Sequence, residues 1–109
     1  MKLPESVKIG AHTYKVIFPY HFKERSDYCA QIDYDMGEIR VSDVDAAGNQ
    51  RIDSQVFVAF LHEVFHGIDR AYFAGNMTKT DSIENLVEGL AQGMAQVVLD
   101  NNFLKSGEE

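Results

Sequence analysis

The chain has 109 residues, which is enough for one domain with a single modest core and too short for two. Hydrophobic residues make up 45% of it and charged residues 25%, the composition of an ordinary globular protein. The formal net charge of −7 argues against nucleic acid or an anionic membrane as the main partner, because the chain has no basic stripe to meet phosphates.

Targeting and redox features favour a cytoplasmic protein without a membrane partner. The single Cys29 excludes an intrachain disulfide framework, and its apolar surroundings predict a small buried side chain. Met1–Glu5 lacks the apolar segment of a signal peptide. The longest uninterrupted apolar run, Val56–Leu61, is far too short to cross a bilayer.

The first 42 residues predict a small antiparallel sheet of three to four strands, over residues 6–42. Residues 6–18 alternate in polarity around Gly10-Ala11, which suits a tight hairpin turn. Two further short strands, at 28–34 and 38–42, flank a turn containing a glycine. Consecutive short strands joined by turns are typical of an antiparallel sheet built from hairpins.

The second half of the chain predicts two long helices, so that the fold class is α+β, with the sheet packed on the helices in one domain. Residues 51–73 are mostly apolar, which indicates a helix buried on most of its faces and a phenylalanine series that packs in the core. Residues 81–101 carry apolar side chains at helical spacing. Asp81 and Glu84 have the spacing of a capping box at the start of this second helix.

The first helix contains His62 and His66 with Glu63 beside the first of them. Residues four apart on a helix lie one above the other, so both imidazoles can face one divalent ion. Glu63 lies about 100° round the helix, where it can serve as general base without binding the metal. Burial of three ionisable groups costs several kcal/mol unless something compensates, and a Zn²⁺ ion would do so.

A catalytic zinc needs a third protein ligand, and the second helix offers two carboxylates one turn apart. Glu84 has another role available, as the capping-box partner of Asp81. Glu88 lies mid-helix among small residues, Gly89, Ala91, Gly93 and Ala95, which let another backbone approach closely. Glu88 is therefore the preferred third ligand, and Glu84 stays open.

The motif His62-Glu63-Val64-Phe65-His66, followed by a glutamate on the next helix, resembles the gluzincin arrangement of zinc metallopeptidases. The segment from Glu88 to Ala95 is similar to that of ImmA/IrrE-like and small phage or prophage peptidases. The resemblance implies a minimal zincin fold, with His62, His66 and Glu88 as zinc ligands and Glu63 as general base. It also implies that Glu38–Ser42 is the edge strand bordering the cleft.

These expectations combine into a zinc metallopeptidase that cleaves a peptide or protein substrate lying extended along Glu38–Ser42. The alternative is a non-catalytic, metal-stabilised binding or regulatory protein of phage or prophage type, with the metal as a clamp between the two helices.

The other polar candidates have less definite roles. Asp69 could accept a hydrogen bond from an imidazole, or pair with Arg70 or Lys79. His12 and His21 are expected to face solvent. Four tyrosines could donate to the oxyanion of a tetrahedral intermediate. These are Tyr14, Tyr28, Tyr34 and Tyr72.

Overall fold

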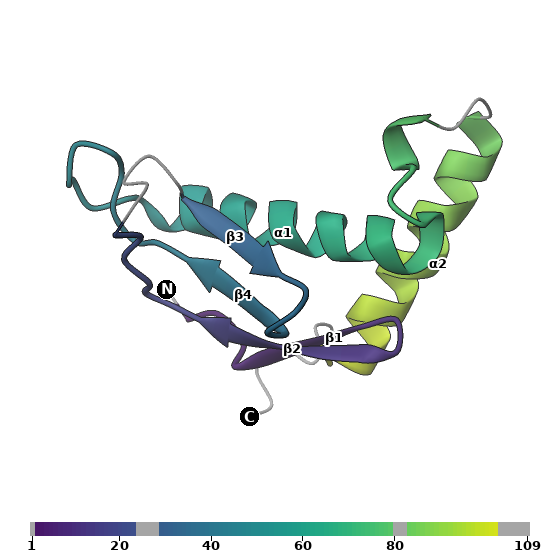
Figure 1. Ribbon diagram of the computed structural model, residues 1–109, viewed down its shortest axis with the longest axis horizontal. Helices are drawn as coiled ribbons and strands as arrows, with labels where there is room; N and C mark the ends of the chain where they lie inside the picture. The colour runs from purple at the N-terminus through teal and green to yellow at the C-terminus, as the bar shows by residue number, and fades with distance from the viewer. Residues whose placement is uncertain (1, 24–28, 80–82, 103–109) are drawn as a thin grey trace.

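A four-stranded sheet lies against one long helix, and a second helix crosses that helix near its C-terminal end (Figure 1). The computed structural model describes residues 2–23, 29–79 and 83–102. The predicted α+β class, with a small sheet packed on helices, is confirmed. In chain order the elements are β1 (Ser6–Ile9), β2 (His12–Ile17), β3 (Ala30–Asp33), β4 (Glu38–Val41), α1 (Asp53–Phe73), the short 3₁₀ helix η1 (Met77–Lys79) and α2 (Ile83–Asp100).

The β1–β2 hairpin turns at Gly10-Ala11, as its sequence predicts. Ile9 pairs with His12, and Gly10 has a φ of 63°, a conformation that glycine adopts without strain. A side chain at Gly10 would also meet the Cβ of Ala71 at 2.9 Å, so that the turn can lie directly on α1.

The sheet is mixed, which corrects the purely antiparallel prediction. Its order is β1-β2-β4-β3, and β2 pairs with β4 in parallel. β4 is therefore an interior strand, so the expectation that Glu38–Ser42 forms the cleft edge is wrong; β3 is the edge strand on that side. The reason lies in burial: Ile39 and Val41 of β4 are fully buried, whereas every residue of β3 is only partly buried. The more apolar strand takes the interior position.

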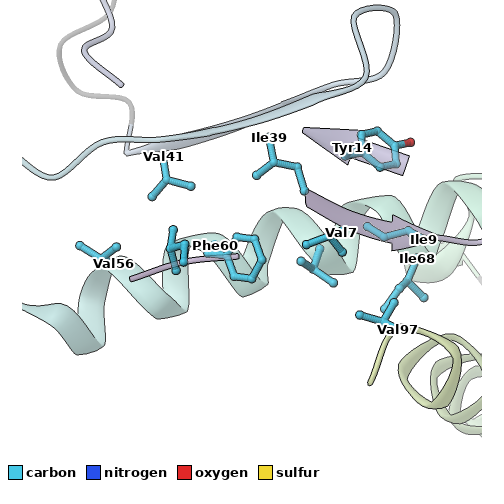
Figure 2. Packing of buried hydrophobic residues seen from close by; sticks show 11 residues of the cluster. Val7, Ile9, Tyr14, Ile39, Val41, Val56, Phe60, Ile68 and Val97 are labelled. Carbon is cyan, nitrogen blue, oxygen red and sulfur yellow. The ribbon is translucent and has the colours of Figure 1, made fainter. Parts of the chain in front are cut away.

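One face of α1 fills the core against the sheet (Figure 2). Val56, Phe60, Val64 and Ile68 follow one another at intervals of four residues, and each is at most 2% exposed. The prediction of a helix buried on most faces is wrong, because the outer face is open: Phe65 is 40% exposed. From the sheet, the same cluster receives Val7 and Ile9 of β1 and Ile39 and Val41 of β4.

Small residues and one glutamine fix α2. A side chain at Gly93 would meet Ile68 of α1 at 2.5 Å, so the helices touch backbone to side chain there. Gln96 accepts a hydrogen bond from the Gly10 amide and donates one to the Lys8 carbonyl, both at 2.8 Å. The C-terminal half of α2 is therefore anchored to β1, while its first turns stand clear of the sheet (Figure 1). The predicted N-cap, Asp81, lies outside the described residues.

Two further expectations can be compared with the structure. Cys29 is exposed and lies just before β3, so the prediction of a buried thiol is wrong. Among the described residues, neither α1 nor α2 has the length and apolar content needed to span a membrane.

Candidate metal centre

His62 and His66 meet on the solvent-facing side of α1. Their Nε2 atoms lie 3.1 Å apart, and the ring centroids lie 4.8 Å apart with the rings at 72° to each other. Both side chains are exposed, in the middle of a regular 21-residue helix. The predicted convergence of the two imidazoles is therefore present in the structure.

The geometry of this pair fits two ligands of one small dication. Two nitrogens bound to a tetrahedral zinc at about 2.0–2.1 Å stand about 3.3 Å from each other. The observed Nε2–Nε2 distance of 3.1 Å is within a few tenths of an ångström of that value. Without a cation, one ring must donate and the other accept, because two lone pairs facing each other repel.

Glu63 lies beside the pair but points into the protein, and only 7% of it is exposed. Burial raises the pKa of its carboxyl, while His66, His62 and a hydrogen bond from the Ile32 amide act in the opposite direction. The bond to Ile32 ties the carboxylate to the edge strand β3. Glu63 thus lies next to the histidines and is held by the sheet, and its role as general base stays a prediction.

The described structure does not bring a third ligand to this pair. The Glu88 carboxylate is exposed and accepts a hydrogen bond from the Gln92 side chain at 2.7 Å. On the helix, Glu88 is about 140° from Gly93, which faces α1. Glu84 is exposed one turn earlier. Within the described part of the chain, no three His, Cys, Asp or Glu side chains are grouped to hold a metal ion.

A groove of about 830 Å³ runs along α1 and ends at His62 and Glu63. Small apolar side chains form much of its wall, and Arg51 lies in the wall beyond them. Arg51 donates to the Ser42 and Gln55 carbonyls, both at 3.2 Å, and so fixes the loop after β4 to the start of α1. The small apolar residues of the wall are Ala30, Val44, Ala46, Val58 and Ala59.

The backbone of β3 faces this groove. The Ser42 backbone amide donates to the Cys29 carbonyl at 2.9 Å. Because bonded pairs alternate in an antiparallel ladder, the odd-numbered residues of β3 are the ones that hydrogen-bond to β4. The amide and carbonyl groups of Ala30 and Ile32 therefore point away from β4. The Ile32 amide is used by Glu63, and the Ala30 amide and carbonyl have no partner among the described residues at the wall of the groove.

Sequence reasoning missed a second contact with the helix turn of the histidines. The Tyr34 hydroxyl, one of four tyrosines considered for the oxyanion, donates to the His66 carbonyl at 3.1 Å. No local signal identifies this partner, which is 32 residues away.

The other polar candidates have different positions. Asp69 accepts a hydrogen bond from the Met77 amide at 2.8 Å, so it orders the turn after α1. His12 and His21 are exposed, as expected, and His21 lies 3.4 Å from the Asp43 carboxylate. Tyr28 lies outside the described residues.

Comparison with protein-family models, with curated proteins and with solved structures gives no significant match to this chain.

Proposed function

We propose that this protein is a zinc-dependent peptidase in which His62 and His66 hold the metal and Glu63 is the general base. The observation that supports the proposal most strongly is the 3.1 Å approach of the two imidazole nitrogens directly beside a buried carboxylate. Zinc, when bound, would supply the Lewis acid that activates a water molecule and polarises a peptide carbonyl.

The role of Glu63 follows from its surroundings. A buried carboxyl with a raised pKa accepts a proton more readily than an exposed one. Glu63 would take the proton of the attacking water and pass it to the leaving amine. The Ile32 amide would keep the carboxylate in one orientation during both transfers.

The substrate would lie in the groove beside α1 and pair with the free backbone groups of Ala30, adding a strand to the edge of the sheet. This placement replaces the one on Glu38–Ser42, because the strand containing those residues already has a neighbour on each side. The small apolar residues in the wall of the groove would accept modest apolar side chains.

Glu88 stays a proposal as the third ligand, and it requires α2 to turn. Its carboxylate would have to leave Gln92 and rotate toward α1. The alternative function, a metal clamp between the helices, needs the same rotation and in addition a closed coordination shell. The open, solvent-facing histidine pair beside a groove favours the enzyme. As part of this proposal we place the protein in the cytoplasm, where the exposed thiol of Cys29 stays reduced.

The test is hydrolysis of a peptide library by zinc-loaded wild type and by the Glu63→Gln variant, analysed by mass spectrometry. We expect cleavage by wild type and, with zinc still bound, a loss of at least about a hundred-fold in the variant, the size of a general-base contribution. Equal cleavage by both proteins would refute the assigned role of Glu63. Absence of cleavage by zinc-loaded wild type would refute the peptidase.

A further inference from the structure

Two cavities lie beyond the histidine pair, on the side away from the groove. They have volumes of about 350 and 320 Å³, and both are lined by His12, Tyr14 and Arg70. Arg70 follows His66 by four residues and His62 by eight, so all three lie on one side of α1. The groove, the histidines and the cavities therefore follow one another along α1.

Arg70 has a cationic group without a counter-ion among the residues that the structure describes. Its guanidinium carbon lies over the Tyr34 ring, 4.2 Å from the ring centre, which is a cation–π contact. Within the described residues it makes no hydrogen bond and no ion pair, although the chain has a net charge of −7. The cation–π contact positions the guanidinium, and its N–H donors have no partner in the described part of the chain.

Tyr14 supplies a second free donor next to it. The residue is only 5% exposed, yet its hydroxyl has no hydrogen-bond partner in the described part of the chain. Figure 2 shows its ring at the border of the core cluster, with the oxygen at the outer end. The hydroxyl lies at the wall of the two cavities, so it is available to donate to a ligand that accepts a hydrogen bond there.

We propose that Arg70 and Tyr14 bind the carboxylate of a peptide, either its C-terminus or an acidic side chain. A guanidinium fork matches a carboxylate in shape and charge, and a phenol can donate to the same group. His12 adds an exposed imidazole to the same wall. Asp35 lines the first cavity and opposes the anion, so it would limit the affinity.

This assignment rests on the proposed function for the direction in which the peptide lies. Arg70 lies four positions after His66 on the helix, a rise of about 6 Å, which equals about two residues of extended peptide at roughly 3.3 Å each. A peptide that crosses the histidine pair would therefore reach Arg70 with a carboxylate about two residues beyond the bond that is cleaved. The substrate class is then a peptide with a negative charge at that position.

The experiment is an NMR titration of the Glu63→Gln protein, chosen so that no turnover occurs, with three blocked pentapeptides. The first is acetyl-Ala-Ala-Val-Ala-Ala as the free acid, the second is its C-terminal amide, and the third is the amide with Asp as its last residue. We expect the uncharged amide to bind about ten-fold more weakly than the free acid, the effect of losing a charged hydrogen bond. Tight binding of the Asp-containing amide would identify an acidic side chain as a ligand, and weak binding would identify the C-terminus.

Variants assign the effect to the two residues. Arg70→Ala should reduce binding of the free acid to the level of the amide, Tyr14→Phe should weaken it a few-fold, and Asp35→Asn should strengthen it. Lys15→Ala is the matched control, because Lys15 is an exposed cation that follows Tyr14 in β2 and faces the other side of the sheet. It should leave all three affinities unchanged.

The site is refuted if the free acid does not bind measurably, if all three peptides bind equally, or if Arg70→Ala keeps the difference between acid and amide. None of these readings involves hydrolysis. If the protein discriminates between the peptides but cleaves none, the carboxylate site stands and the peptidase is refuted. If it cleaves peptides without discriminating between them, the peptidase stands and the carboxylate site is refuted.

Discussion

Replacing Glu63 by Gln should stabilise the metal-free protein at neutral pH. Glu63 is only 7% exposed, and burial of an ionised carboxylate costs several kcal/mol. The neighbouring histidines and the hydrogen bond from the Ile32 amide offset part of that cost. A Gln carbonyl can accept the same hydrogen bond without the charge. We expect a net gain of about 1 kcal/mol, equivalent to about 4–8 °C in melting temperature.

The gain should depend on pH in a defined direction. Because the pKa of Glu63 is raised, the folded protein holds this proton more firmly than the unfolded chain does. The cost of the charge is therefore absent below the unfolded pKa, near 4.3, and grows as the pH rises to the folded value. The advantage of Glu63→Gln should be complete at pH 8 and vanish below about pH 4.

The assay is urea denaturation of both proteins, freed of metal, across this pH range. Glu5→Gln is the control, since Glu5 is exposed and its replacement should change stability by less than about 0.5 kcal/mol. A Glu63→Gln variant less stable than wild type at pH 8 would show that the carboxylate is a favourable structural contact. Glu63 would then contribute to stability rather than lower it, and a functional cost at this position would be refuted.

Four substitutions test the fold itself. Phe60→Ala should cost about 3–5 kcal/mol and Phe65→Ala less than about 1, because Phe60 is fully buried and Phe65 is 40% exposed; similar losses would mean that α1 is turned differently. Gly93→Ala should cost about 1–2 kcal/mol despite its better helix propensity, and a stabilised variant would contradict the close contact with α1. Arg40→Ala should raise the pKa of Asp33, which the Met36 amide and then Arg40 hold below its usual value. An unchanged carboxyl titration in NMR would refute this ion pair.

Local signals predicted the elements well, because each depends on a few neighbouring residues. The Gly10-Ala11 turn and both long helices follow from turn chemistry and apolar spacing. The strand order was mispredicted, because it depends on competition between strands. β4, and not β3, pairs with β2. The full burial of Ile39 and Val41 explains why β4 has the interior position.

The candidate site divides in the same way. The approach of His62 and His66 follows from helix geometry alone, so the sequence suffices for it. The hydrogen bond from Ile32 to Glu63 joins segments 31 positions apart, and no pattern in either segment encodes it. Of the four small residues of α2 that were linked to a close helix contact, Gly89 and Gly93 meet α1, whereas Ala91 and Ala95 are exposed. The sequence does not show which of the small residues contact α1, so it also does not show on which side of α2 Glu88 lies.

Zinc binding tests the central claim most directly, by calorimetric titration of the purified protein with metal analysis of the complex. We expect one zinc per chain in wild type and in His12→Ala, whose imidazole lies apart on the hairpin. His66→Ala should lose more affinity than the ten- to hundred-fold that removal of an outer partner costs. A wild type that binds no zinc, or a His66→Ala variant that binds it equally well, would contradict the account.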